Sequence, residues 1–278
     1  MLVRPMGPAD VPAATAVALQ AFEIADEEAS RARSSTRISH LLATDPDGAF
    51  VLERDGEVIG VALALLRERL WFLSLLTVRP DRQSTGAGRA LMERVLGYGD
   101  ATGPGMITSS DDPRAERLYR RTGFQLRPTT LFEGTLDRAR LPAPHPQVRI
   151  AGQGDLDALA EISRSLRGAA HTPDLEFALA EGIVLLRLAD RGLAALSPGR
   201  LVLLLAAHDE EAASALLWHA LELVGDSEEP LVRWVTAEQR WARSVARRAG
   251  LSVKNYGALA VRGGPGPLHP YLPWGTFG

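Results

Sequence analysis

A short loop with two glycines carries the residues of this chain that could do chemistry. The loop, Gln83-Ser84-Thr85-Gly86-Ala87-Gly88-Arg89, stands between an apolar segment, 71–78, and an amphipathic segment, 90–96. Small residues let a ligand approach the backbone, and the start of a helix presents free N–H groups together with the positive end of the helix dipole. The loop therefore predicts an anion site, where its backbone and Arg89 would hold a phosphate group.

The glycine spacing has a second interpretation, because two glycines also suit a tight strand-to-helix turn with no ligand. Two other phosphate motifs are excluded. No Gly-Lys-Ser/Thr follows the loop, so it is not a P-loop, and the third position of a Gly-x-Gly-x-x-Gly motif is occupied by Leu91.

The residues around the loop are similar to a known family motif. Val78-Arg79-Pro80 followed by Gln83-x-x-Gly86-x-Gly88 resembles the acetyl-CoA loop of the GCN5-related N-acetyltransferases (GNAT), whose pattern is Gln/Arg-x-x-Gly-x-Gly/Ala. A second segment resembles the family's Asn-x-x-Ala-x-x-Leu-Tyr-x-x-x-Gly-Phe motif; it reads Asp112-x-x-Ala115-x-x-Leu118-Tyr119-x-x-x-Gly123-Phe124. The resemblance spans residues 2–137.

This resemblance implies an N-acetyltransferase that uses acetyl-CoA as co-substrate. A primary amine of a small molecule or peptide would attack the thioester directly, and Tyr119 would donate a proton to the departing thiolate. A buried aromatic with a packing role is the alternative for Tyr119. By the same resemblance, the residues that bind acetyl-CoA are Leu76, Val78, Gln83, Ser84, Thr85, Gly86, Ala87, Gly88 and Arg89.

The residue that would accept the proton of the amine is not evident. The strand 71–77 carries no carboxylate. Candidates are a chain of water molecules or one of five carboxylates, Glu23, Asp26, Glu27, Glu28 and Asp111. The acidic cluster 23–28 also fits a solvated helix face, and no base is assigned.

The elements that must position these residues follow from hydrophobic periodicity and turn signals. They are strands at 2–4, 49–53, 57–66 and 71–78, helices at 10–22 and 26–43, a helix after the glycine loop, a strand at 106–109, a helix at 113–122, and strands at 124–126 and 130–136. Asp55-Gly56 predicts a hairpin, and Asp112 an N-cap. This is the GNAT order. The fold class is α/β (α+β), with mixed, mostly antiparallel sheets flanked by helices.

The chain then repeats itself after a Pro-rich linker. Val3-Arg4 and Asp10-Val11 recur as Val148-Arg149 and Asp155-Leu156, and an internal duplication explains this most simply. We expect an acetyl-CoA-binding GNAT domain at 1–140, a linker at 141–146 and a degenerate GNAT-like domain at 147–278.

The second copy keeps the fold signals and loses the ligand signals. Its loop, His208-Asp209-Glu210-Glu211, has no glycine and three carboxylates, which would repel a pyrophosphate. Ala246 stands where the first copy has Tyr119. Thr236 and Gln239 have the spacing of a capping box.

Two further segments of the second copy are unusual. The run 167–174 fits either a cleft lining or a turn with a capping aspartate. The tail, 263–278, is rich in proline, glycine and aromatic residues, so we expect it to pack rather than extend freely; it could close the substrate side of the first domain.

Composition narrows the class of protein. The 278 residues include no cysteine, and the six histidines lack metal-site spacing, so we expect no metal. A net charge of −3 favours neither nucleic acid nor an anionic membrane as partner. With no apolar leader or long apolar run, we expect a cytoplasmic protein. We expect it to be a monomer or a homodimer. A non-catalytic acyl-CoA-binding or interaction protein that keeps the fold is the alternative function.

Overall fold

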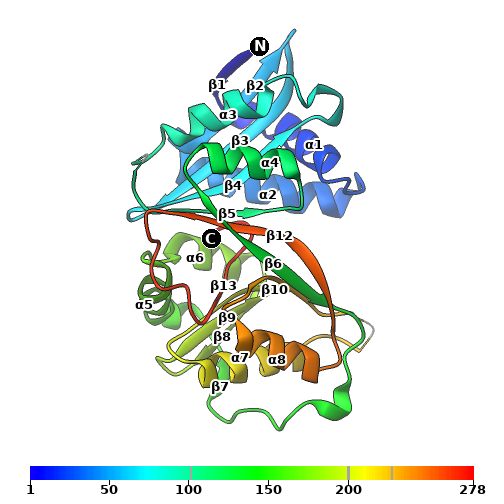
Figure 1. Cartoon of the computed structure of the whole chain (residues 1–278), viewed down its shortest axis with the longest axis vertical. Coiled ribbons are helices and arrows are strands. Elements are labelled where there is room, and N and C mark those ends of the chain that lie inside the picture. Colours follow the sequence, from blue (N-terminus) through cyan, green and yellow to red (C-terminus); the bar gives the residue numbers. More distant parts are fainter. Residues whose placement is uncertain (101, 199–200, 227) are drawn as a thin grey trace. The chain divides into compact units, whose positions relative to one another are not determined.

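The computed structural model describes residues 1–100, 102–198, 201–226 and 228–278. Its internal contacts divide the chain into two compact units, Met1–Pro104 and Gly105–Gly278, called here the N-terminal and C-terminal units (Figure 1). Helices and mainly antiparallel strands build both of them, which confirms the predicted α/β (α+β) class.

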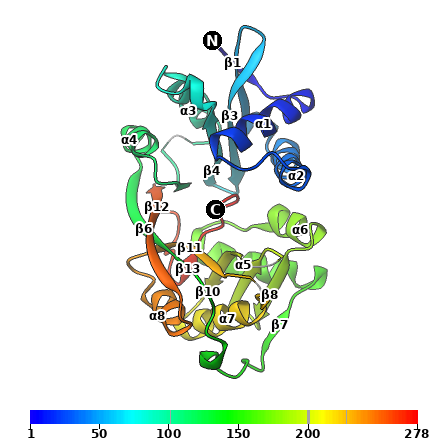
Figure 2. The same cartoon turned by 90° about the vertical axis from the view of Figure 1, so that its right-hand side faces the viewer.

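The N-terminal unit is a four-stranded antiparallel sheet with helices on both faces. Neighbouring strands pair in the order β1-β2-β3-β4. Helices α1 and α2 cover one face and α3 covers the other (Figure 2). The elements are β1 (Leu2–Pro5), α1 (Val11–Ala21), α2 (Glu28–Thr44), β2 (Ala49–Arg54), β3 (Glu57–Arg67), β4 (Leu70–Val78) and α3 (Ala87–Leu96), with short 3-10 turns at Pro8–Asp10, Pro46–Gly48 and Pro80–Arg82.

Two local features of this sheet follow from its sequence. Asp55 and Gly56 both have positive φ, at 54° and 80°, as the expected Asp-Gly hairpin between β2 and β3 requires. In β4, the pairing with β3 shifts: Leu63 stands opposite Leu75, whereas Ala64 stands opposite Leu73. Ser74 is therefore the extra residue of a β-bulge, a feature that is common beside active sites.

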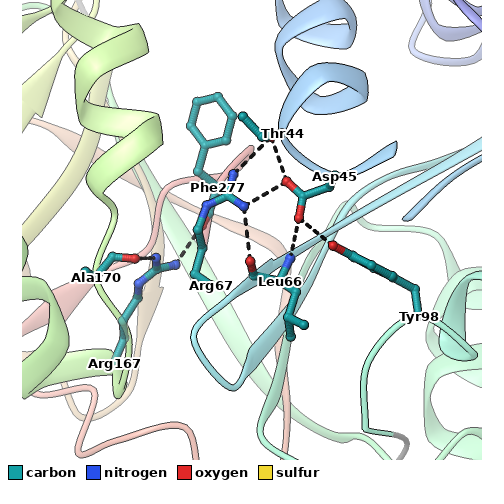
Figure 3. A network of polar contacts seen from close by, with 8 residues as sticks. All are labelled: Thr44, Asp45, Leu66, Arg67, Tyr98, Arg167, Ala170 and Phe277. Carbon is teal, nitrogen blue, oxygen red and sulfur yellow. Dashed lines mark hydrogen bonds and ion pairs between the residues drawn. The ribbon is translucent and has the colours of Figure 1, made fainter. Parts of the chain in front are cut away.

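A buried ion pair ties three elements of this unit together (Figure 3). Asp45, just after α2, accepts hydrogen bonds from the Arg67 guanidinium at 2.7 Å, the Leu66 backbone N–H at 2.8 Å and the Tyr98 hydroxyl at 2.9 Å. Asp45 is 1% exposed and Arg67 is 6% exposed. Several bonds to one carboxylate offset the cost of burying its charge.

The C-terminal unit is built on a larger mixed sheet. The strand order is β5-β12-β6-β11-β10-β9-β8-β7, and β13 pairs with β10. The elements are β5 (Gly105–Ser109), α4 (Pro113–Arg121), β6 (Gln125–Glu133), β7 (Val148–Ile150), α5 (Leu156–Arg167), α6 (Thr172–Ala180), β8 (Val184–Leu188), β9 (Gly192–Leu196), β10 (Leu201–Ala207), α7 (Glu210–Glu222), β11 (Leu231–Thr236), α8 (Arg240–Arg248), β12 (Ser252–Arg262) and β13 (Tyr271–Leu272), with 3-10 turns at Arg138–Arg140 and Gln153–Asp155.

The order of elements supports an internal duplication. The series β1, α1, α2, β2, β3, β4, α3, β5, α4, β6 recurs as β7, α5, α6, β8, β9, β10, α7, β11, α8, β12. Even the 3-10 turn before the first helix is repeated, at Pro8–Asp10 and Gln153–Asp155. We call the two series the first and second repeat.

The last strands of the two repeats are exchanged. Strand β6, from the first repeat, lies between β11 and β12, and β12, from the second repeat, lies between β5 and β6; all of these pairings are antiparallel. The contacts therefore assign β5, α4 and β6 to the C-terminal unit, although we placed a domain boundary at 140 from the sequence. The boundaries 1–140 and 147–278 remain a prediction about the repeats.

Two expectations about local structure are wrong. The strands expected at 124–126 and 130–136 form one strand, β6, which accommodates Pro128 near an irregularity in its pairing with β12. The capping box expected for Thr236 and Gln239 does not form, because α8 begins at Arg240 and no side chain caps it. The Gln239 side chain makes other contacts, described below.

Candidate functional site

The glycine loop lies in the N-terminal unit, between the end of β4 and the start of α3. Gly86 is the N-cap residue of α3, with φ of 87°, and Ala90 N–H donates the first helical hydrogen bond, to Gly86 O at 3.0 Å. The preceding amides of the first turn have no partner within the helix, because an α-helix leaves its first N–H groups unpaired. The loop thus presents donors and the positive end of the α3 dipole.

The two glycines have different reasons to be glycine. Gly86 needs its positive φ, so the turn alone explains it. Gly88 lies inside α3, does not have positive φ, and a Cβ built there meets no atom within 4 Å. Neither the backbone nor the packing requires a glycine at 88, where it costs helix stability. An open surface over Gly88 is what close approach of a phosphate to the backbone needs.

Most side chains of the loop that form bonds stabilise its conformation, and its one charged side chain is paired. Gln83 Nε2 donates to Val78 O at 3.1 Å and so ties the loop to the end of β4. Thr85 Oγ1 donates to Arg82 O at 2.8 Å. Arg89 is exposed and paired with Glu93 at 2.7 Å, one turn along the helix. Its charge is therefore partly balanced, so the backbone amides are the main donors that the loop could offer to an anion.

Strand β4 adds two polar groups that the sequence did not single out. The hydroxyls of Ser74 and Thr77 are buried, and neither has a hydrogen-bond partner among the described residues. Buried unpaired hydroxyls are rare in folded proteins, and a ligand is one explanation for them. Ser74 is the bulge residue, and Leu76 and Val78 follow it along the strand. Two hydroxyl residues inside an otherwise apolar strand were the available signal.

Tyr119 belongs to the C-terminal unit. It is the one residue of α4 that is buried, at 6% exposure. Burial raises the pKa of its phenol above the ordinary value, and the nearby Asp112 carboxylate raises this pKa further. Asp112 is the expected N-cap of α4 and accepts from Arg114 N–H at 2.8 Å. The phenol thus stays protonated at neutral pH, as a proton donor must, although burial equally suits a packing role.

The carboxylates considered as general bases lie on exposed surface. Glu23, Asp26, Glu27, Glu28 and Asp111 are all exposed, and Asp26 pairs with Arg31 at 2.9 Å. A solvated face accounts for this cluster. No metal-binding group of three or more His, Asp or Glu side chains occurs within the described ranges. No helix in the same ranges is long and apolar enough to span a membrane.

The counterpart loop of the second repeat caps its own helix. The Asp209 carboxylate accepts from Ala212 N–H at 2.9 Å, and this bond lowers the pKa of Asp209. Arg191 pairs with Asp209 at 2.9 Å and with Glu211 at 3.2 Å. The start of α7 therefore already carries carboxylates, whereas the start of α3 has a glycine without a side chain.

Comparison with known proteins identifies the family. The model of the Acetyltransferase (GNAT) family matches residues 17–124, a range that includes the glycine loop and Tyr119. Residues 17–124 of this chain therefore belong to the GNAT family. A mycothiol acetyltransferase of Streptomyces coelicolor is 37% identical over 98 residues, which are 33% of this chain and 31% of that protein. An uncharacterized N-acetyltransferase of Mycobacterium tuberculosis is 36% identical over 105 residues, 36% of this chain and 66% of that protein. The chain thus matches less than a third of the length of the mycothiol acetyltransferase.

Solved structures share the fold of this chain over nearly its whole length. A putative acetyltransferase from Pyrococcus horikoshii has a TM-score of 0.82 at 17% identity, over 100% of this chain and 95% of that chain. A tandem GNAT protein from the clavulanic acid biosynthesis pathway has a TM-score of 0.58 at 14% identity, over 94% and 97%. At these identities the likeness shows the fold alone.

Proposed function

We propose that this GNAT protein transfers an acetyl group from acetyl-CoA to a primary amine of a small molecule or peptide. The observation that carries this proposal is Gly88, a helical glycine with open space above it and no structural need for it. The backbone of the loop, Gln83 to Arg89, would hold the pyrophosphate. The backbone of Leu76 and Val78 would pair with the pantetheine arm.

The proposed reaction needs no covalent enzyme intermediate. The amine nitrogen attacks the thioester carbon, a C–N bond forms, and the C–S bond breaks. Tyr119 gives its proton to the leaving thiolate, the nitrogen loses a proton to solvent, and solvent returns a proton to the Tyr119 phenolate. Because burial raises the pKa of the Tyr119 phenol, the phenol is protonated at neutral pH and carries the proton that the thiolate needs.

The repeats would divide the work unequally. The first repeat, 1–140, would bind acetyl-CoA, and the second, 147–278, would not, because Asp209 and its neighbouring glutamates occupy the start of α7. The acceptor amine can be sought by testing candidate amines with acetyl-CoA. The substrate of the mycothiol acetyltransferases should be among them, because part of this chain is similar to one of these enzymes.

A thermal-shift titration tests the proposal. At a hundredfold excess over Kd, a ligand that binds only the folded state stabilises it by about 2.7 kcal/mol. We expect acetyl-CoA to raise the Tm of the parent and of Gly154→Glu, and to leave Gly88→Glu unshifted. Gly154 is the matched control, because a Cβ there also meets nothing within 4 Å and it lies in the second repeat. No shift in any of the three proteins would overturn the proposal.

A further inference from the structure

Strands β3 and β4, next to the glycine loop of the first repeat, have close counterparts in the second repeat. Gly60 in β3 and Gly192 in β9 are equivalent, because a Cβ at either would strike the same kind of neighbour. That neighbour is Leu91 Cδ1 at 2.9 Å in the first repeat and Leu216 Cδ1 at 2.6 Å in the second. Each leucine comes from the helix after the loop. The two repeats thus share the close approach of this helix to the sheet.

This correspondence fixes the register of β4 against β10. Val78 stands opposite the first glycine and Ala207 opposite the second. Each strand has a bulge at the same distance before that point, at Ser74 in β4 and at Leu203 in β10. Ala207 is therefore the counterpart of Val78, and Leu205 is the counterpart of Leu76.

The tail of the chain lies on this part of β10. Strand β10 pairs in parallel with β11 at its start, at Leu201 and Val202. Further along, β13 pairs with β10, with Leu272 opposite Leu205 and Tyr271 opposite Ala206, and Ala207 N–H donates to Pro270 O at 3.3 Å. The tail is thus an added strand on the counterparts of Leu76 and Val78 (Figure 1).

Two side chains at the starts of α8 and α7 also contact the tail. Gln239, the counterpart of Asp112, donates from Nε2 to Leu268 O at 2.8 Å and accepts from Tyr271 N–H at 3.2 Å. His269 Nε2 lies 3.2 Å from the Glu210 carboxylate, in the first turn of α7. The tail therefore starts beside the helix that corresponds to α3 and then follows the strand that corresponds to β4.

The end of the tail is anchored in the interior of the C-terminal unit. Trp274 and Phe277 are each 2% exposed, and their rings make an edge-to-face contact with centroids 4.8 Å apart. Arg167, fully buried, donates to Phe277 O and to Ala170 O, both at 2.7 Å (Figure 3). It also donates to Ala169 O at 2.9 Å. The tail thus supplies one of the carbonyl groups that satisfy a buried charge, which makes its position costly to abandon.

We propose that most of the tail, residues 265–278, is a built-in peptide ligand of the second repeat. It stands as an added strand in the place where the resemblance puts the pantetheine arm of an acyl-CoA in the first repeat. Together with the carboxylates at the start of α7, it leaves the second repeat no acyl-CoA site. The chain therefore binds one acyl-CoA; this count rests on the proposed function, whereas the place of the tail does not.

Hydrogen exchange tests the place of the tail without any cofactor. We expect the amides of Ala207 and Tyr271 to be protected in the full chain. In Gln239→Ala, which removes two bonds to the tail, we expect peptides that contain them to exchange at least about tenfold faster. Gln153→Ala, at an exposed glutamine of the same repeat, is the matched control. Unchanged exchange in Gln239→Ala, or no protection in the parent, overturns the proposal.

A cut chain gives a second readout that does not depend on the fold of a variant. A protease site inserted at the exposed Gly263-Gly264 separates the tail covalently. We expect the tail peptide to remain with the protein through gel filtration. Loss of the peptide from a protein that keeps its parent Tm contradicts the proposal.

Calorimetry with acetyl-CoA then counts the sites. We expect one site in the parent and none in Gly88→Glu. Two sites in the parent, or one site in Gly88→Glu, would place acyl-CoA in the second repeat and overturn the proposal. No site in the parent refutes the proposed function alone, and hydrogen exchange and tail retention still decide the place of the tail.

Discussion

Gly88 is a residue whose identity the fold itself does not explain. It lies in the first turn of α3, and a Cβ there meets nothing within 4 Å. We predict that Gly88→Ala stabilises the protein by about 0.5–1 kcal/mol, because alanine loses less backbone entropy in a helix. The same methyl group would hinder close approach of a phosphate, so we expect the KM for acetyl-CoA to rise. Opposite signs for stability and binding distinguish a ligand cradle from a turn.

Denaturant unfolding and steady-state kinetics measure the two effects of Gly88→Ala. Gly154→Ala is the control, since that glycine also has open space and no positive φ. We expect it to leave the KM unchanged. A Gly88→Ala variant that is more stable and keeps the parent KM would show that Gly88 is not needed for acetyl-CoA binding.

Tyr119 gives a prediction in the pH dependence of the reaction. Burial and Asp112 raise the pKa of the phenol above its ordinary value of about 10. The protonated form is thus kept as pH rises, and donation fails only above the raised pKa. We expect kcat to show no loss on the alkaline side up to about pH 10. A fall in kcat centred between pH 7 and 9 would mean that another group is the acid.

Removal of the same hydroxyl separates an enzyme from a binding protein. We predict that Tyr119→Phe lowers kcat by about 10²- to 10⁴-fold, the usual contribution of a general acid, and leaves the Kd for acetyl-CoA nearly unchanged. Tyr256→Phe, at a half-buried tyrosine of the same unit, is the control. Equal kcat values for both variants would favour the non-catalytic alternative and leave Tyr119 a packing residue.

Among the elements, the connection after α2 depends on one carboxylate. Asp45 accepts from Arg67, the Leu66 amide and Tyr98, which belong to β3 and to the residues after α3. We predict that Asp45→Ala lowers the free energy of unfolding by about 3–5 kcal/mol, because Arg67 loses a buried countercharge. Urea unfolding measures this loss. Asp47→Ala, two residues further at an exposed position, should cost far less, and equal losses would contradict the argument.

Local sequence signals predicted the elements well and their partners poorly. Asp112 at the start of α4 and Asp55-Gly56 in the hairpin act through neighbours in the chain, so their types suffice. Gln239 has the spacing of a capping box but binds the tail, because Leu268 and Tyr271 reach it from far along the chain. In the glycine loop, the residue types at 83–89 indicated an anion site. The bulge at Ser74, in contrast, follows from the pairing of β3 with β4, which the sequence does not reveal.

At the scale of the whole molecule, the exchange of β6 and β12 could not be predicted from a tandem repeat in the sequence. Strand β6 pairs with β11 and β12, so the end of the first repeat is held between two strands of the second. The pairing of β5 with β12 adds a further connection. Two repeats joined in this way do not depend on their linker to stay together.

A protease site in the exposed segment 142–144 tests this dependence. After cleavage, we expect the two fragments to elute together in gel filtration, because the strand pairs of β6 with β11 and β12 remain. The covalent link contributes only the entropy of joining two chains, so unfolding should stay cooperative while the Tm becomes dependent on protein concentration. Fragments that separate without denaturant would show that the exchanged strands contribute little to holding the repeats together. The control is a protease site in the exposed hairpin at 55–56, which precedes the exchanged strands in the chain. Cleavage there should leave the two repeats associated as well.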